Sequence, residues 1–173
     1  MRELLSVPAY IRHGRPARDP EAPPDGRARW QNARSDAPST HILFQPLTVT
    51  LRTFIVEDNA TIRENLIGTL EELASIQALG WAESEADARA WLTRTKGGWD
   101  LAIIDLFLRQ GSGLGVLEAC RERGPRQRVV VLSNYATTDM RKRCSQLGAD
   151  AVFDKSNEID ALIDYCMQQS ASA

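Results

Sequence analysis

The 173-residue sequence has no long apolar run, few cysteines and almost no net charge, and each shortage excludes a class of protein. No stretch approaches the roughly 20 apolar residues that a membrane-spanning helix needs, and the N-terminus lacks the basic start and apolar core of a signal peptide. We therefore expect a cytoplasmic protein without membrane insertion. Cys120, Cys144 and Cys166 are odd in number and widely spaced, so they form neither a disulfide framework nor a zinc pattern.

Proline is nearly absent from most of the chain, because seven of the eight prolines lie in residues 1–48. That segment has seven arginines, no lysine and five acidic residues, whereas the rest has 14 basic and 18 acidic residues. Neither part is basic enough to predict direct contact with nucleic acid. We interpret residues 1–48 as a disordered Pro/Arg-rich extension and residues 49–173 as the folded domain. Open alternatives for the extension are a docking arm and a segment that is not translated.

From residue 49 onwards, short apolar runs alternate with amphipathic stretches, which is the pattern of βαβ units around a parallel sheet. The expected strands cover residues 53–56, 76–82, 100–105, 128–133 and 151–154. The expected helices cover residues 60–73, from a cap at Ser84 to about residue 95, 113–123, 138–147, and a last stretch carrying Ile159, Leu162, Ile163 and Cys166. Right-handed crossovers place helices on both faces of such a sheet, so the pattern predicts a doubly wound α/β sandwich.

Polar side chains follow four of these strands at the point where each strand ends. Glu57 and Asp58 follow the first strand, Asp105 ends the third, Ser133 ends the fourth, and Lys155 comes just after the fifth. The carboxyl ends of parallel strands lie side by side at one edge of the sheet, where ligands bind. Three carboxylates at that edge repel one another, so either a cation neutralises them or one of them takes up a proton.

This set of residues predicts phosphoryl chemistry. Mg²⁺ typically binds through one or two carboxylates plus a phosphate oxygen, and a carboxylate beside it can attack a phosphoryl group. A lysine and a hydroxyl supply the positioning charge and donor that a phosphoryl group requires. Each residue taken singly is more common as a solvated turn or surface group. The prediction therefore depends on their joint placement at the strand ends.

The segments at these strand ends resemble the receiver domain of bacterial two-component response regulators, over about residues 52–168. They read FIVEDN at residues 54–59, IDLFLRQGSGL at 104–114, VLSNY at 131–135 and LGADAVFDKS at 147–156. The resemblance implies a five-stranded flavodoxin-like sheet in the order 2-1-3-4-5 with five helices. It also implies a response regulator that works in phosphorelay signal transduction and catalyses at most its own phosphorylation and dephosphorylation.

The resemblance implies a role in phosphoryl transfer for three residues. Asp105 matches the aspartate that becomes a 4-aspartylphosphate by taking a phosphoryl group from a phosphohistidine. Ser133 matches the switch hydroxyl that turns toward the phosphoryl group, and Lys155 matches the lysine that forms an ion pair with it. We further hypothesise that Phe107 and Tyr135, which flank the acceptor, restrict the access of attacking water.

The resemblance also implies a magnesium site and no other cofactor. Glu57 and Asp58 match the acidic pair that holds Mg²⁺, with Asp58 favoured as the direct ligand. Asp105 and the backbone carbonyl of Phe107 complete the expected set of protein ligands.

The chain departs from the family pattern at three positions. Family members often have proline where this chain has Arg109, and they usually have proline after the lysine, where this chain has Ser156. The aromatic switch residue of the family corresponds to Val152 here, with Phe153 next to it. Adjacent residues of a strand point to opposite faces, so Phe153 is not expected to replace the missing aromatic residue.

A stand-alone phosphorylated receiver is the main interpretation, with one open alternative and one disfavoured alternative. The chain ends about one helix after Lys155, which predicts a stand-alone receiver that interacts with a sensor histidine kinase or phosphotransfer protein and with an unidentified downstream protein. One alternative is a phosphorylation-independent adaptor, which a substitution at Asp105 or Lys155 would have favoured. A flavodoxin-like cofactor binder is disfavoured, because the acidic Glu57-Asp58 pair repels a phosphate unless a metal intervenes.

Overall fold

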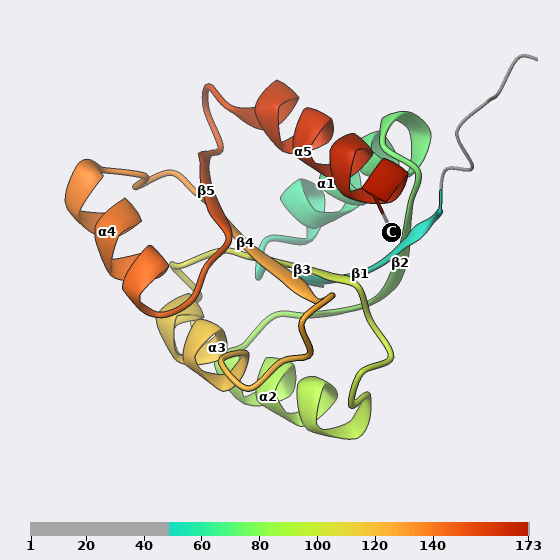
Figure 1. The fold of residues 1–173 in the computed structure, drawn as a ribbon. Coiled ribbons are helices and arrows are strands. Elements are labelled where there is room, and N and C mark those ends of the chain that lie inside the picture. Colours follow the sequence, from blue (N-terminus) through green and yellow to red (C-terminus); the bar gives the residue numbers. More distant parts are fainter. Residues whose placement is uncertain (1–48, 173) are drawn as a thin grey trace, which may run out of the picture. The chain divides into compact units, whose positions relative to one another are not determined.

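The computed structural model describes residues 49–172, which form five parallel strands alternating with five helices (Figure 1). The strands are β1 (Leu51–Val56), β2 (Ile76–Ala82), β3 (Leu101–Ile104), β4 (Arg128–Ser133) and β5 (Ala151–Asp154). The helices are α1 (Ala60–Leu73), α2 (Glu85–Arg94), α3 (Gly113–Ala119), α4 (Thr138–Gln146) and α5 (Ile159–Ser172). The strand order β2-β1-β3-β4-β5 confirms the predicted fold. No helix within residues 49–172 is long and apolar enough to cross a membrane.

The interpretation of residues 1–48 as a disordered extension concerns residues outside this described range. The boundary placed at residue 49 therefore stays a prediction.

Helices cover both faces of the sheet, with α1 and α5 on one face and α2, α3 and α4 on the other (Figure 1). Consecutive residues of a strand point to opposite faces, so each central strand supplies side chains to both layers. In β1, Phe54 and Val56 pack in the core beneath α2, α3 and α4, whereas Ile55 packs in the core beneath α1 and α5. Burial on both faces explains why these strands read as continuous apolar runs.

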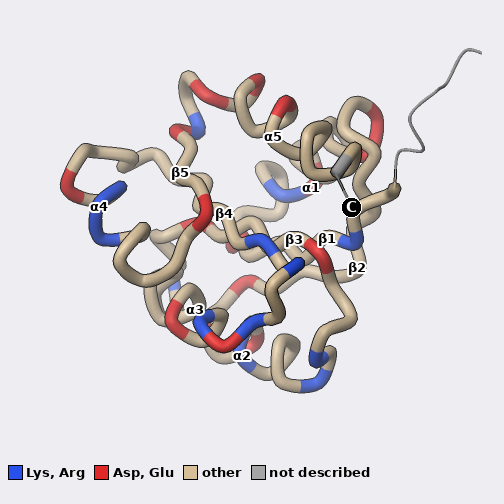
Figure 2. Tube along the Cα trace, in the orientation of Figure 1, with Lys and Arg blue, Asp and Glu red and all other residues tan. Residues whose placement is uncertain are grey.

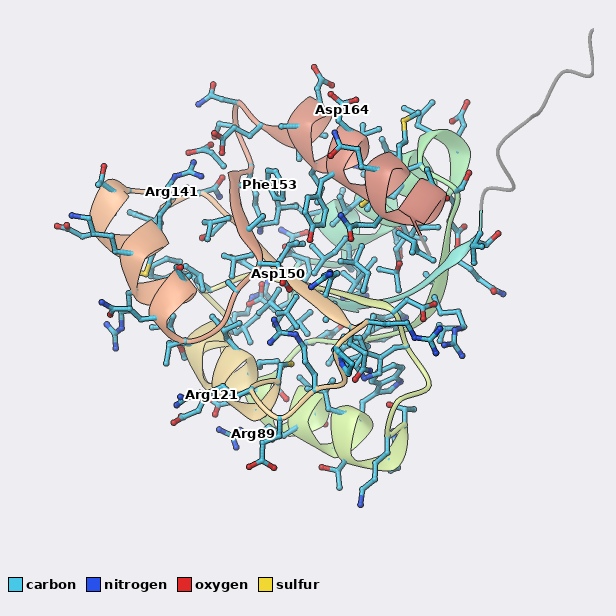
Figure 3. All side chains as sticks on the ribbon, in the orientation of Figure 1. Arg89, Arg121, Arg141, Asp150, Phe153 and Asp164 are labelled. Atoms are coloured by element: carbon cyan, nitrogen blue, oxygen red, sulfur yellow. The ribbon has the colours of Figure 1, made fainter. Side chains whose placement is uncertain are left out.

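The two neighbouring side chains of β5 lie on opposite faces of the sheet, as strand alternation predicts. Val152 packs against the core beneath α2, α3 and α4. Phe153 packs against the core beneath α1 and α5, where its ring centroid lies 5.8 Å from that of Tyr165 (Figure 3). The aromatic ring of β5 is therefore on the far side of the sheet from α4.

The end of the third helix was predicted wrongly, because α3 stops at Ala119 and not near residue 123. After the cap at Cys120, the chain continues in a tighter turn. The Arg121 N–H donates to the Glu118 carbonyl (3.2 Å), and the Arg123 N–H donates to the Cys120 carbonyl (3.2 Å). Such three-residue spacing commonly ends an α-helix. The other boundaries differ from prediction by at most two residues, as at β1, which begins at Leu51.

Four helices begin with a side-chain cap close to the carboxyl ends of the strands. Asn59 caps α1, Ser84 caps α2 as predicted, Ser112 caps α3 and Thr137 caps α4. Each cap accepts a hydrogen bond from a backbone N–H of the first helical turn. Polar caps thus fix the chain reversals that surround this edge of the sheet.

The three cysteines are free and buried, as expected for small apolar side chains. Burial raises the pKa of the Cys120 thiol to about 11 and that of the Cys166 thiol to about 12. Burial also raises the pKa of Cys144. Because the thiolate is the reactive form, these cysteines are structural rather than catalytic.

Candidate functional site

A cavity of about 200 Å³ lies at the carboxyl ends of β1, β3, β4 and β5. The structure brings together in its lining every residue that the sequence predicted for the site: Glu57, Asp58, Asp105, Phe107, Ser133 and Lys155. The remaining lining residues are Asn59, Ile62, Arg109, Asn134 and Tyr135. Residues up to 98 positions apart in the chain thus share one small polar pocket.

Lys155 connects two of the three carboxylates in the cavity. Its Nζ donates to Glu57 Oε2 (2.5 Å) and to Asp105 Oδ2 (2.7 Å). All three side chains are at most 10% exposed. Burial lowers the pKa of Lys155, but the hydrogen bonds and charges of Asp105 and Glu57 outweigh it and raise the pKa above its ordinary value. The ammonium group therefore stays charged at neutral pH and offsets the repulsion between the two carboxylates.

Asp105 directly follows β3 and is held by backbone contacts. Its N–H donates to the Val56 carbonyl (2.9 Å), and its Oδ1 accepts a hydrogen bond from the Phe107 N–H (3.3 Å). The start of α3 passes so close that a β-carbon on Gly113 would lie 2.0 Å from the Asp105 carbonyl oxygen. Only glycine allows this approach, which fixes the loop that carries the Asp105 carboxylate.

Replacing Gly113 by alanine is expected to destabilise the fold by about 2 kcal/mol, because the added methyl group meets backbone atoms that have no room to move. Gly68, exposed in α1 with nothing within 4 Å of an added β-carbon, offers the matched control. Gly68→Ala should be neutral or stabilising by up to about 1 kcal/mol. Urea denaturation measures both changes. Equal midpoints for Gly113→Ala and wild type would contradict the close approach.

Asp58 is held by the loop after β3. Its Oδ2 accepts a hydrogen bond from the backbone N–H of Arg109 (2.7 Å), and the Nε of the Arg109 side chain lies 3.4 Å from the same oxygen. The Arg109 side chain is 76% exposed, so the ion pair contributes little and the backbone hydrogen bond is the stronger contact. A proline at position 109 could not donate this hydrogen bond.

Ser133 and two aromatic rings form the remaining wall of the cavity. Ser133 is fully buried, and its Oγ accepts a hydrogen bond from the Tyr135 N–H (3.4 Å). The rings of Phe107 and Tyr135 contact each other, with centroids 4.7 Å apart, and are 53% and 60% exposed. Since large aromatic rings are usually at least partly buried, this exposed pair in the same lining as Asp105 is a feature of the site.

The donor atoms of the cavity fit a magnesium ion that keeps part of its water shell. Glu57, Asp58 and Asp105 offer only carboxylate oxygens, which are the ligands that Mg²⁺ prefers, and Phe107 lies in the same lining. Within residues 49–172, no group of three or more His, Cys, Asp or Glu side chains is arranged so that it could hold a metal ion. An incomplete protein cage suits Mg²⁺, which typically uses one or two carboxylates and several waters.

Arg141 of α4, labelled in Figure 3, links the loop after β4, strand β5 and the residue before α5. Its guanidinium donates to the Ala136 carbonyl (2.9 Å), to the Val152 carbonyl and to Glu158 Oε2 (2.6 Å). Hydrogen bonds from Arg141 and from the Asp154 N–H lower the pKa of Glu158. Figure 2 shows that α4 carries basic residues after an acidic first turn, whereas the charged residues of α5 are acidic. A polar network therefore joins the loop after β4 to β5 and to the residues before α5.

Sequence reasoning missed two arginines that contact the acidic turn after β1. Arg109 reaches Asp58 from the loop after β3, and Arg63 reaches the Glu57 carbonyl from α1. Both look like ordinary helix or loop arginines in the sequence. The one available signal was at position 109, where a residue other than proline keeps its backbone N–H.

The fold and the site together define the class of this protein. It is a doubly wound α/β domain with an acidic cavity and a bridging lysine at the carboxyl edge of a 2-1-3-4-5 sheet. Residues 53–166 match the sequence model of the response regulator receiver domain family, and the chain belongs to this family. It is thus the receiver domain of a two-component response regulator, within a family of signalling regulators.

One curated relative is similar to this chain in sequence, and two solved structures are similar to it in fold. The photosynthetic apparatus regulatory protein RegA of Cereibacter sphaeroides is 30% identical over 108 residues, which are 61% of this chain and 56% of RegA. The chain therefore spans about half the length of this relative. The signal receiver domain of NarL from Mycobacterium tuberculosis has a TM-score of 0.58 at 21% identity. The match covers 68% of this chain and 97% of the NarL chain.

The second structure is a chain of the CheX-CheY-BeF3-Mg complex from Borrelia burgdorferi. It has a TM-score of 0.62 at 17% identity, and the match covers 69% of this chain and 89% of the chain in the complex. At this level of identity, the two structures support the fold, while the chemistry must be inferred from the residues of this chain.

Proposed function

We propose that this receiver domain acts in phosphorelay signalling by accepting a phosphoryl group on Asp105. The supporting observation is the Lys155 ammonium, which is held between Asp105 and Glu57 inside the cavity. A carboxylate with a fixed counter-charge, beside further oxygen ligands, is suited to receive a phosphoryl group and to balance its charge. The proposed donor is a sensor histidine kinase or a phosphotransfer protein.

In the proposed step, an Asp105 carboxylate oxygen attacks the phosphorus atom of a phosphohistidine. The P–N bond breaks, and the imidazole of the donor leaves with the electron pair of that bond. The Lys155 ammonium, which already contacts Asp105, then forms an ion pair with a phosphoryl oxygen. The Ser133 hydroxyl turns from its neighbouring backbone N–H and donates a hydrogen bond to another phosphoryl oxygen.

Glu57, Asp58, Asp105 and the Phe107 carbonyl are the residues that we propose to hold Mg²⁺. When bound, the ion supplies positive charge that offsets the negative charge of the phosphoryl oxygens. The backbone N–H of Arg109 orients the Asp58 carboxylate for this role, and the Asn59 N–H, which donates to Glu57 Oε1 (3.0 Å), does the same for Glu57.

We propose that the output is a protein surface that a downstream protein reads. The Arg141 network offers a route from the site, because Ala136 lies three residues after Ser133, in the loop that follows β4. Through Arg141, a displacement of that loop acts on the Val152 carbonyl and on Glu158. This polar route does not require the aromatic switch residue that Val152 replaces.

Incubation with Mg²⁺ and acetyl phosphate tests the proposal. Intact mass spectrometry should show a gain of about 80 Da, which corresponds to one phosphoryl group. The second candidate function is a phosphorylation-independent adaptor, and the non-aromatic Val152 is the observation that favours it. Folded protein without an adduct, in the presence of the metal and the donor, would support the adaptor.

Replacing Phe107 by asparagine is expected to speed the hydrolysis of the aspartyl phosphate several-fold. The exposed Phe107 ring shields the acceptor together with Tyr135, and a smaller polar side chain admits and orients water. The decay of the phosphorylated protein after removal of the donor measures the rate. Tyr135→Phe, which keeps the ring, should leave the rate unchanged. An unchanged rate for Phe107→Asn would reject the shielding role.

A further inference from the structure

Arg63 is a charged side chain that is almost completely buried, with 5% of its surface exposed. Its Nη1 donates to the Glu57 carbonyl (3.0 Å) and lies 3.0 Å from Glu83 Oε1. The guanidinium carbon lies 4.0 Å from the centroid of the Trp81 ring. A buried guanidinium requires such partners, and here they come from two segments of the chain, the turn after β1 and the end of β2 with the residue that follows it.

The contact with Glu57 falls on the turn that carries two proposed metal ligands. The Glu57 carbonyl belongs to the peptide group that joins Glu57 to Asp58, and this group is planar and rigid. The Glu57 N–H on the other side donates to the Ala82 carbonyl (3.0 Å). With both peptide groups of Glu57 held, the directions in which the two carboxylates leave the turn are restricted.

We propose that Arg63 is a positioning residue for the metal site, which sets the affinity of the cavity for Mg²⁺ without touching the ion or the phosphoryl group. This inference rests on the proposed function, because it assumes that Glu57 and Asp58 bind the ion. Partners that orient metal ligands from outside the coordination shell commonly change metal affinity by about 10-fold or more when they are removed. The rate of phosphoryl transfer at saturating Mg²⁺ should not depend on Arg63.

Arg63 also contributes to stability, and the structure separates this contribution from the positioning role. The contacts with Glu83 and Trp81 connect α1 to β2 and to the loop after it, and they involve neither Glu57 nor Asp58. Glu83 is half exposed, with 50% of its side-chain surface accessible. Glu83→Gln therefore weakens the ion pair and leaves the hydrogen bond from Arg63 to the Glu57 carbonyl in place.

Titration of the 173-residue chain with Mg²⁺ in a calorimeter tests the inference directly. Arg63→Met should raise the dissociation constant for Mg²⁺ by about 10-fold. In phosphorylation by acetyl phosphate, the half-saturating Mg²⁺ concentration should rise by the same factor, while the rate at saturating Mg²⁺ stays at the wild-type value. Arg63→Lys, whose ammonium can still donate to the Glu57 carbonyl, should show a smaller rise and serves as the test if Arg63→Met does not fold.

Glu83→Gln is the matched control for the structural contribution. It should lower the denaturation midpoint while leaving the dissociation constant for Mg²⁺ unchanged. An unchanged constant in both Arg63 variants, or an equal rise in Glu83→Gln, would overturn the positioning role and leave the proposed function intact. A wild-type chain that binds no Mg²⁺ would overturn both.

Discussion

Asp105→Asn is expected to abolish phosphoryl uptake while leaving the domain folded. Asparagine has the shape of aspartate, but its neutral amide oxygen is too weak a nucleophile to attack phosphorus. The amide oxygen can still accept the hydrogen bond from the Phe107 N–H, and Lys155 keeps its contact with Glu57. The substitution removes one of two neighbouring carboxylates, so its effect on stability should be small compared with its effect on chemistry.

Intact mass spectrometry after incubation with Mg²⁺ and acetyl phosphate distinguishes the variant from wild type. Wild type should gain about 80 Da, and Asp105→Asn should gain nothing. Asp164→Asn is the control for the loss of one carboxylate, because Asp164 is exposed on α5, away from the cavity (Figure 3). It should be phosphorylated like wild type. An adduct on Asp105→Asn would mean that another side chain accepts the group, and peptide mapping would identify it.

The fold could be predicted from the sequence because its signals are local. The apolar run of β2 and the helical spacing of apolar residues in α1 predict the first and last residue of both elements correctly. Each element begins and ends with a clear change in the apolar pattern. The end of α3 lacks such a signal. There, the Arg123 side chain donates to the Gln127 and Gly148 carbonyls, so tertiary contacts decide how the chain leaves the helix.

The residues of the candidate site could be predicted, but not all of their contacts. Asp105 and Ser133 stand at the ends of apolar runs, and the topology alone brings strand ends together. The opposite faces of Val152 and Phe153 followed from the two-residue period of a strand. No sequence pattern predicted the hydrogen bond of Arg63, and at position 109 the sequence showed only that a backbone N–H is available, because a long side chain or a loop N–H finds its partner only after the elements have packed.

Lys155→Met is expected to lower the free energy of unfolding by about 3 kcal/mol. The substitution keeps most of the side-chain volume but leaves Glu57 and Asp105, 3% and 9% exposed, without their shared counter-charge. Removing one partner of a buried ion pair typically costs about 3–5 kcal/mol, and some relaxation of the side chains toward the cavity reduces the loss. Urea denaturation without metal measures it. Added Mg²⁺ should restore part of the stability, because an ion held at the proposed site would stabilise the folded state and not the unfolded one.

The double variant Lys155→Met/Glu57→Gln separates charge repulsion from lost packing. If repulsion between the two carboxylates causes the deficit, removing the charge of Glu57 should recover a large part of it. Glutamine can still accept the Asn59 N–H, so the turn after β1 keeps its local hydrogen bond. The expected coupling energy between the two sites is about 1–3 kcal/mol. If the losses of unfolding free energy from the two single substitutions simply add in the double variant, the effect of Lys155→Met comes from packing around the lysine stem. Lys155 would then not balance the charge of Asp105.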